Sequence, residues 1–464
     1  MTLIKSISGI RGTIGGSIGE GLTPFDAVKF AAAYGQFIKN RSDIKAPKVV
    51  VGRDARLSGQ MISDLVVSTL QGLGIHVVDL GLSTTPTVEI AVPMEKAQGG
   101  IILTASHNPK QWNALKLLNE EGEFLSAKDG KEILAIAEKE DYQFSEVDDL
   151  GTLVKDDSYL QKHITSVLNL KLVDPELIRR KNFKIVVDAV NSTGGIFVPA
   201  LLRALGVADV IELYCEPTGH FPHNPEPLPE NLTEISKKIE ETHADLGIVV
   251  DPDVDRLAFV NEDGTMFGEE YTLVAVADYI LSRTPGNTVS NLSSTISLKE
   301  VTDKYQGIYN AASVGEVNVV EKMKETNAVI GGEGNGGIIY PESHYGRDAL
   351  VGIALFLTHL AKSGLTASEL RQEYPNYYIS KNKIQLEPSM DVDAILSAVA
   401  GQYASHEVDL QDGVKIYFEG GEWVHLRKSN TEPIIRIYSE SKNKSKAGDL
   451  AQLIMTAIKE VAVA

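Results

Sequence analysis

Short apolar runs recur in three groups along the chain, and each group follows the same plan. Every group holds three β-rich runs, and a polar loop follows the last of them. The runs span 48–51, 75–78 and 101–103, then 185–187, 210–213 and 247–250, then 288–290, 307–309 and 328–330. Continuous apolar runs that alternate with helical segments are typical of mostly parallel sheets covered on both faces. The sequence therefore predicts an α/β protein with three similar domains, whose sheets are mixed and mostly parallel.

The rest of the chain has a different texture. After Pro375, two strand-like runs are followed by a closing helix from about Lys444 to Val461, which predicts a smaller C-terminal α+β domain. The acidic stretch 138–150 marks a boundary near residue 151. The predicted domains are 1–151 with a serine loop, 152–258 with an acidic loop, 259–373 with a glycine-rich loop, and 374–464.

Charge and composition exclude several classes of protein. A net charge of -19 argues against a nucleic-acid partner, because phosphates need a basic face. No apolar run approaches the roughly 20 residues that span a bilayer, and the first residues lack the apolar core of a signal peptide. The single cysteine, Cys215, excludes an internal disulfide. We expect a cytoplasmic protein with no membrane partner, although a few local cations could still bind a small phosphorylated ligand.

A polar loop follows the last strand of each predicted α/β domain. These loops are Thr104–Pro109, Asp251–Arg256 and Gly331–Gly337. Ligands of open α/β sheets bind at the carboxyl ends of the strands. Three similar domains with loops at the same topological place therefore predict a shared central cleft.

The first loop carries Ser106 between a small residue and Asn108-Pro109, which favours a tight, exposed turn. Two interpretations of this serine remain open from the loop alone. It could carry chemistry at the end of a buried strand, or it could cap a following helix.

The second loop places Asp251, Asp253 and Asp255 at alternate positions. Three neighbouring carboxylates repel one another unless a hard cation binds them. An EF-hand would explain Glu262 at the twelfth position, but Arg256 stands where that loop requires glycine, and the flanks resemble strands. A solvated acidic turn is a further alternative. The loop has no His or Cys, which argues against Zn²⁺, so Mg²⁺ is the favoured ion.

The glycine-rich loop 332–337 matches the spacing of the dinucleotide-binding fingerprint. That interpretation is rejected, because 338–341 reads Ile-Ile-Tyr-Pro and does not begin a helix. The loop presents Glu333 and Asn335, which suit hydrogen bonds to neighbouring hydroxyl groups. A purely structural glycine turn is the alternative.

A fourth loop, 427–433, combines two cations, two hydroxyls and an amide, and Arg436 lies just beyond it. Such a set can surround a phosphate dianion with charge-assisted hydrogen bonds. A capping box at Ser429-x-x-Glu432 is the alternative, although the alternating residues after Pro433 indicate a strand. The phosphate-binding loop of nucleotide hydrolases is absent from the sequence, so ATP is not an obvious substrate.

Taken together and in this order, the four loops resemble those of the α-D-phosphohexomutase superfamily over nearly the full length of the chain. The resemblance implies four domains around a central cleft and an enzyme that moves phosphate between O1 and O6 of a hexose. It also implies a phosphorylated serine, Mg²⁺, and a hexose 1,6-bisphosphate as intermediate and activator.

The resemblance assigns roles to individual residues. Ser106 matches the phosphorylated serine, and Asp251, Asp253 and Asp255 match the Mg²⁺ ligands, completed by the phosphate on Ser106. The residues implied in phosphoryl transfer are Arg11, His107, Lys116 and Arg256, with the lysine as a candidate acid/base. The sugar loop is matched by Glu333 and Asn335. The site for the non-reacting phosphate is matched by Arg427, Ser429, Asn430, Thr431 and Arg436.

The sugar loop departs from the pattern Gly-Glu-x-Ser-Gly, often followed by His. Asn335 replaces the serine, and Gly337 stands at the histidine position. His344 could substitute as a base, or it could be a surface histidine. Asn335, with Trp112-Asn113-Ala114, looks most like phosphoglucosamine-mutase-type members. The alternatives are a phosphomannomutase/phosphoglucomutase of broad specificity, a serine-nucleophile phosphomonoesterase, and a non-catalytic phosphosugar-binding protein.

Overall fold

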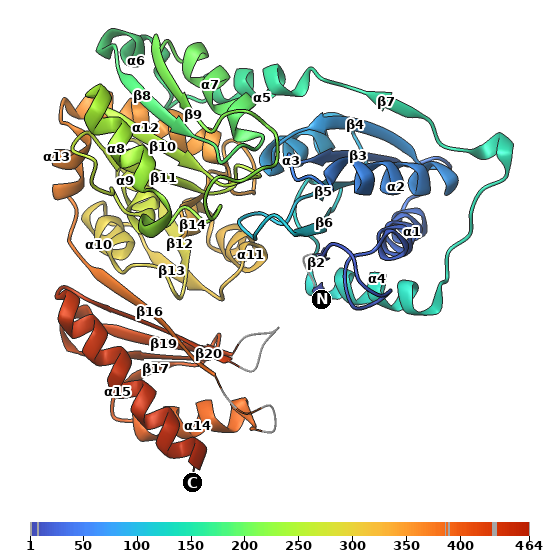
Figure 1. The fold of residues 1–464 in the computed structure, drawn as a ribbon. Helices are drawn as coiled ribbons and strands as arrows, with labels where there is room; N and C mark the ends of the chain where they lie inside the picture. The colour runs from blue at the N-terminus through green and yellow to red at the C-terminus, as the bar shows by residue number, and fades with distance from the viewer. Residues whose placement is uncertain (1, 7–8, 386, 388–389, 429–433, 464) are drawn as a thin grey trace. The chain divides into compact units, whose positions relative to one another are not determined.

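The computed structural model describes residues 2–6, 9–385, 387, 390–428 and 434–463, which form two compact units (Figure 1). The first unit comprises residues 1–272 and 335–370, and the second comprises 273–334 and 371–464. Among the described residues, no helix combines the length and apolar character needed to cross a membrane.

The first domain is built on a seven-stranded mixed sheet with the order β1-β2-β6-β5-β3-β4-β7. Strands β5, β3, β4 and β7 are parallel, whereas β1, β2 and β6 join through antiparallel pairs. The strands are β1 (Leu3–Ser6), β2 (Gly9–Thr13), β3 (Lys48–Arg53), β4 (His76–Leu82), β5 (Gly99–Leu103), β6 (Trp112–Leu118) and β7 (Leu153–Lys155). The three predicted runs thus form the parallel centre of this sheet.

Helices cover both faces of this sheet, as its continuous apolar strands require. Val49 and Val51 of β3 join one core with α1 (Pro24–Arg41), α2 (Gly59–Gly72) and α4 (Ala127–Lys139). Val50 points to the opposite core, which includes α3 (Thr85–Met94). The start of α1 is fixed by a capping box between Thr23 and Asp26.

The second domain has the sheet order β11-β10-β8-β9. Its elements are α5 (Tyr159–Leu168), α6 (Pro175–Lys181), β8 (Lys184–Asp188), α7 (Gly194–Ala204), β9 (Asp209–Leu213), α8 (Thr233–Thr242), β10 (Leu246–Val250) and β11 (Leu257–Asn261). The later segment β15 (Gly337–Ile339) and α12 (Ala349–Ser363) also belongs to this unit. Phe356 of α12 stacks on Phe259 of β11, with ring centroids 3.8 Å apart.

The second unit begins within α9 (Glu269–Leu281) and contains the third α/β domain. Parallel strands lie in the order β13-β12-β14. The elements are β12 (Asn287–Asn291), α10 (Ser297–Lys304), β13 (Tyr309–Ala312), α11 (Glu316–Thr326) and β14 (Ala328–Glu333). The strand expected at 307–309 is shifted toward the C-terminus. The predicted loop Gly331–Gly337 is shorter than expected, because β14 continues to Glu333 and β15 begins at Gly337.

The C-terminal domain is the predicted α+β domain. Its antiparallel sheet has the order β16-β20-β19-β18-β17. The elements are α13 (Ala367–Gln372), β16 (Tyr378–Gln385), α14 (Val392–Gln402), β17 (Glu407–Asp409), β18 (Val414–Tyr417), β19 (Trp423–Lys428), β20 (Ile434–Ser441) and α15 (Lys444–Val463), of which α13 leads in from the first unit. The sheet packs on α14 and α15 through one apolar core. Three α/β domains and a C-terminal domain confirm the predicted fold class.

Candidate active site

Ser106 lies in the loop after β5, with a left-handed φ of 48°. Its N–H donates to the Thr104 hydroxyl at 2.9 Å. The next element is strand β6, so the interpretation of Ser106 as a helix cap is wrong. Residues 109–111 are exposed as expected, but Ser106 itself is only 8% exposed. Its hydroxyl is therefore held inside the protein.

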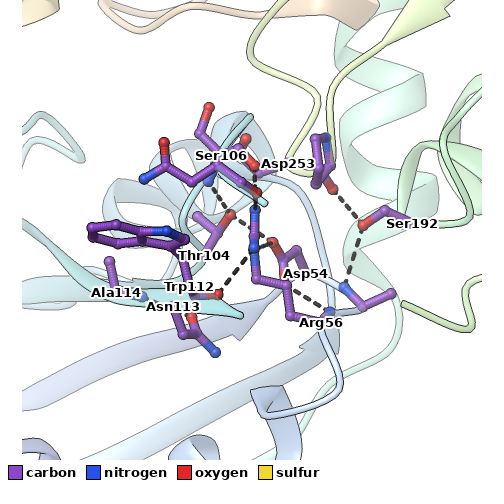
Figure 2. A network of polar contacts seen from close by, with 12 residues as sticks. Asp54, Arg56, Thr104, Ser106, Trp112, Asn113, Ala114, Ser192 and Asp253 are labelled. Carbon is purple, nitrogen blue, oxygen red and sulfur yellow. Dashed lines mark hydrogen bonds and ion pairs between the residues drawn. The ribbon is translucent and has the colours of Figure 1, made fainter. Parts of the chain in front are cut away.

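The backbone of the serine loop is held by Arg56, a fully buried residue that follows β3 (Figure 2). Its Nε pairs with Asp54 Oδ2 at 2.9 Å, so the charge is balanced. Its two terminal nitrogens donate to four loop carbonyls, those of Ser106, Asn108, Pro109 and Trp112. A guanidinium is suited to this task because it carries five donors in a fixed plane. Sequence reasoning missed Arg56, since only its burial and these contacts mark it.

The three aspartates follow β10 and precede β11, so strands flank the loop on both sides. An EF-hand requires helices there and is excluded. All three side chains are fully buried, and one carboxylate oxygen from each lies within 4.8 Å of the other two. Burial also excludes the solvated acidic turn. Among the residues that the structure describes, this is the cluster of carboxylate, His and Cys groups that could hold a metal ion.

Asp251 joins the acidic loop to the serine loop. Its Oδ2 accepts the Ser106 hydroxyl at 2.7 Å, and its Oδ1 accepts the backbone N–H groups of Asp255 and Arg256 at 3.2 Å. Burial and the carboxylates of Asp253 and Asp255 raise the pKa of Asp251 well above its usual value. The triad is thus under electrostatic strain that a bound cation would relieve.

In the other two aspartates only one carboxylate oxygen, Oδ2, has partners within the described ranges. Asp253 Oδ2 accepts the Thr85 hydroxyl at 2.6 Å and lies 2.7 Å from Lys116 Nζ. Asp255 Oδ2 lies 2.6 Å from Arg347 Nη2 and 3.4 Å from Lys116 Nζ. The Oδ1 atoms of Asp253 and Asp255 are buried, and no hydrogen-bond partner for them exists within the described part of the chain. Hard oxygen atoms left in this state fit a divalent cation.

Lys116 extends from β6 into this cluster. Burial would lower its pKa, but Asp253 and Asp255 outweigh burial and raise that pKa above its usual value. Lys116 is therefore a cation held near the triad, suited to neutralise negative charge. Its role as an acid/base stays a prediction. Arg11 on β2 pairs in register with Ala114, two residues before Lys116 on β6.

His107 follows Ser106, and its Nδ1 lies 3.4 Å from the Ser106 hydroxyl oxygen. Burial, reinforced by Arg256 nearby, holds the pKa of His107 well below its usual value. The imidazole is therefore neutral at pH 7. Arg256 forms an ion pair of 3.5 Å with Glu226. The structure thus brings Ser106, His107, Lys116, Arg256 and the aspartates into one site.

A further contact ties the acidic loop to the loop that carries Arg56. The Ser192 hydroxyl donates to the carbonyl of Pro252 at 2.7 Å and accepts the N–H of Ala55 at 3.3 Å (Figure 2). Ser192 lies just before α7 in the second domain. This bridge fixes the acidic loop against the first domain.

Glu333 ends β14 in the second unit. Its Oε1 accepts hydrogen bonds from Asn291 Nδ2 at 2.8 Å and from the Gly315 N–H at 3.1 Å. Asn335 belongs to the first unit, and its Oδ1 accepts the Gly337 N–H at 3.2 Å. Strand β15 follows this loop, which confirms that it is not a dinucleotide fingerprint.

Two of the residues predicted to bind phosphate are cross-strand neighbours in the C-terminal sheet. Arg427 of β19 lies directly opposite Arg436 of β20, so both side chains lie on one face. Arg427 Nε lies 2.7 Å from Asp412 Oδ2. Strand β20 begins at Ile434. The alternative of a capping box at Ser429 and Glu432 lies outside the described residues. Ser429, Asn430 and Thr431 lie outside the described residues.

His344 is not a surface residue, because its side chain is 13% exposed. Its Nε2 lies 3.2 Å from Asp348 Oδ2, and its Nδ1 lies 3.5 Å from Glu89. Asp348 also caps α12 and accepts from His163. These contacts hold the His344 side chain beside the start of α12, and its role as a base stays a prediction.

Four family models match successive parts of the chain. The phosphoglucomutase/phosphomannomutase α/β/α domains I, II and III match residues 3–144, 158–264 and 268–378, and the C-terminal domain of the same family matches 383–457.

Relatives match over the same length. A phosphoglucomutase/phosphomannomutase of Thermococcus kodakarensis is 38% identical over 459 residues, which cover 97% of this chain and 98% of the relative. A probable phosphoglucosamine mutase of Methanopyrus kandleri is 34% identical over 446 residues, covering 96% and 95%. The crystal structure of a phosphoglucomutase/phosphomannomutase family protein from Burkholderia thailandensis superposes with a TM-score of 0.84 at 25% identity, covering 99% of this chain and 97% of that one.

Proposed function

Because the chain belongs to the phosphoglucomutase/phosphomannomutase family and is therefore a phosphohexomutase, we propose that Ser106 is the residue that exchanges phosphate with a hexose. The reaction interconverts hexose 6-phosphate and hexose 1-phosphate through a hexose 1,6-bisphosphate. The preferred hexose is glucosamine. The observation that carries this proposal is the 2.7 Å contact between the Ser106 hydroxyl and a buried aspartate triad.

The aspartate triad would hold Mg²⁺, because the buried Oδ1 atoms of Asp253 and Asp255 have no hydrogen-bond partner among the described residues. The ion supplies positive charge where two phosphate groups must approach each other. A serine phosphate carries about -1.5 to -2 charges, which also requires cations from the protein. Lys116, Arg256 and Arg11 supply them, and Lys116 is held by two of the aspartates.

The chemistry has two balanced steps. First, the P–O bond to Ser106 Oγ breaks as the phosphoryl group bonds to the free O1 or O6 of the sugar phosphate; that hydroxyl loses its proton, and Ser106 Oγ takes one up. The resulting 1,6-bisphosphate reverses in the site. The other phosphoryl group then returns to Ser106 Oγ, which loses its proton, and the sugar oxygen that it leaves is protonated. Neutral His107, whose Nδ1 lies 3.4 Å from the Ser106 hydroxyl oxygen, is placed to hold the proton that moves at that oxygen. Cationic Lys116 offsets negative charge beside it.

The groups that bind the sugar must serve both orientations. Glu333, held by Asn291 and Gly315, and Asn335 present acceptors to sugar hydroxyl groups. Arg427 and Arg436 share one face of the C-terminal sheet and are the cations for the phosphate that does not react. Ser429, Asn430 and Thr431 complete that site in this proposal.

The choice of glucosamine rests on Asn335 in the sugar loop and on the similarity to the Methanopyrus kandleri protein. A broad-specificity phosphomannomutase/phosphoglucomutase is the second candidate, because the Thermococcus kodakarensis relative carries that name at 38% identity. Rates measured side by side with glucosamine, glucose and mannose 6-phosphates separate the two. Comparable rates on all three would favour the second candidate.

Replacement of the serine tests the mechanism. Ser106→Ala should lose conversion of 6-phosphate to 1-phosphate in Mg²⁺ and should take up no phosphate from a hexose 1,6-bisphosphate. Ser397→Ala, on the exposed face of α14, is the matched control and should behave as the native enzyme. Turnover retained by Ser106→Ala would refute the phosphoserine. Inorganic phosphate released at the rate of turnover would indicate a phosphomonoesterase, and phosphosugar binding without turnover by the native chain would indicate a non-catalytic protein.

A further inference from the structure

Arg347 was not selected from the sequence, yet it contacts the metal-binding candidate directly. The residue lies between β15 and α12 and is 8% exposed. Its Nη2 donates to Asp255 Oδ2 at 2.6 Å. This is the shortest contact between the triad and any cation whose distance the structure gives, since Lys116 approaches at 2.7 and 3.4 Å.

The backbone around Arg347 is fixed on both sides. Arg347 forms a β-bridge with Ile339, and the Asp348 N–H donates to Ile338 at 2.8 Å. The Ala349 N–H donates to the carbonyl of Val254, between two of the aspartates, at 3.2 Å. Asp348 caps α12. The guanidinium is therefore anchored to the acidic loop through main-chain contacts as well as through its own ion pair.

Gly337 provides the space for this arginine. A Cβ atom at position 337 would lie 2.3 Å from Arg347 Cδ and 3.1 Å from its Cγ. Any side chain at position 337 would therefore displace the stem of Arg347. Gly337 is also the position at which the sugar loop has glycine in place of the usual histidine. A histidine there would collide with the side chain of Arg347, so the glycine is what allows Arg347 to reach Asp255. A guanidinium stays protonated at physiological pH and cannot replace a base.

We propose that Arg347 is a positioning residue that orients Asp255 and limits the affinity of the cation site. By holding Oδ2 of Asp255, Arg347 leaves that carboxylate one oxygen, Oδ1, for the cation. Its permanent charge also repels a divalent ion in a buried site where screening is weak. The inference rests on the proposed function, because it assumes that the triad binds a cation.

Binding of Mn²⁺ to the unphosphorylated full chain, followed by electron paramagnetic resonance, tests this without any turnover. In Arg347→Gln, Asp255 Oδ2 loses its closest cationic partner and keeps only the longer contact with Lys116 at 3.4 Å. The triad also loses a positive neighbour, so Mn²⁺ should bind about tenfold more tightly. Arg347→Lys keeps the charge and should stay within about threefold of the native Kd. Gly337→Ala, which pushes the stem away, should shift the Kd in the same direction as Arg347→Gln. Activity of Arg347→Gln should fall through kcat, and Arg347→Lys should recover part of it.

The outcomes separate this inference from the proposed function. Native chain that binds no Mn²⁺ at one site would refute the cation site itself. Native binding with an unchanged or weaker Kd in folded Arg347→Gln and Gly337→Ala would overturn the role of Arg347. A purely structural role would lower the thermal midpoint of the variants and leave the Kd of the folded fraction unchanged. If Arg347→Gln fails to fold, Gly337→Ala decides, because it retains the guanidinium.

Discussion

The hydroxyl of Ser106 lies 2.7 Å from Oδ2 of Asp251, although 145 residues separate the two in sequence. The contact joins the loop after β5 of the first domain to the loop after β10 of the second. Both loops occupy the carboxyl ends of parallel strands, where ligands of α/β sheets bind. The serine is thus placed at the edge of the aspartate triad.

Replacing Asp251 by asparagine should separate charge from shape at this contact. Asp251→Asn keeps an acceptor for Ser106 but removes one of three carboxylates, so Mn²⁺ should bind at least tenfold more weakly and kcat should fall by about 10²-fold or more. Asp263→Asn, in the exposed turn after β11, is the matched control and should change neither quantity. Native Mn²⁺ affinity in Asp251→Asn would remove this aspartate from the ligand set.

Arg56→Lys tests whether the serine loop must be held by a planar guanidinium. A lysine retains the charge beside Asp54 but has one nitrogen, so most of the four loop carbonyls lose their donor. We expect a loss of stability of about 2 kcal/mol and a kcat about tenfold lower. Slower phosphorylation of Ser106 by a hexose 1,6-bisphosphate, measured by intact mass, should accompany the change.

Arg53→Lys is the control for that variant. Arg53 lies three residues earlier, at the end of β3, and donates to the exposed side chain of Gln60. Its replacement should leave the loop and the phosphorylation rate unchanged. If Arg56→Lys phosphorylates at the native rate, the four carbonyl contacts do not position Ser106.

The elements and loops that could be predicted from the sequence are those with a local signal. The apolar run of β10 and the alternating carboxylates after it mark Asp251–Arg256 without any tertiary information. The length of β14 could not be predicted, because Gly331 and Gly332 are poor strand residues. They extend the strand through pairing with Val289 and Ser290 of β12, and a Cβ on Gly331 would lie 2.4 Å from the sulfur of Met323.

The arginines of the site could not be ranked from the sequence for a related reason. Arg56 and Arg347 resemble other arginines until burial and partners are known. Arg347 meets Asp255 across 92 residues, and Arg56 meets Asn108 across 52. Such contacts depend on how distant parts of the chain pack together, and they produce no periodic pattern in the sequence. Gly337 was the one visible sign, since a missing side chain at that position leaves space for another group.

Thr85→Val tests the hydrogen bond that an uncharged side chain donates to the aspartate triad. The Thr85 hydroxyl donates to Asp253 Oδ2 at 2.6 Å, and valine has nearly the same shape without the donor. Leaving a buried carboxylate oxygen with one partner fewer costs about 1 to 3 kcal/mol. The thermal midpoint of unfolding should fall in Thr85→Val, and added Mg²⁺ should raise the midpoint of the variant by more than it raises that of the native protein. A midpoint independent of Mg²⁺ in both proteins would argue against a cation at Asp253.

Glu440 of the second unit should make stability depend on pH. It is fully buried, and its Oε2 accepts the N–H groups of Trp423 Nε1 and Ile296 at 2.5 and 2.9 Å. Burial raises the pKa of Glu440 to about 7, although hydrogen bonds from Thr295, Ile296 and Trp423 oppose the shift.

An acid whose folded pKa exceeds its unfolded value stabilises the fold below the unfolded pKa, and the contribution is lost as pH rises through the folded pKa. The unit that contains Glu440 should therefore lose about 3 kcal/mol between pH 4.5 and pH 7 from this group alone. Glu440→Gln keeps the acceptor and cannot ionise, so its stability should match native protein at pH 4.5 and exceed it at pH 8. The stability of both proteins at each pH is measured by the fluorescence of Trp423 during urea unfolding, in a Trp112→Phe background. Glu419→Gln, at an exposed turn, is the control and should follow the native pH profile. If Glu440→Gln lost as much stability between pH 4.5 and pH 8 as the native protein, ionisation of Glu440 would not be the cause of the loss.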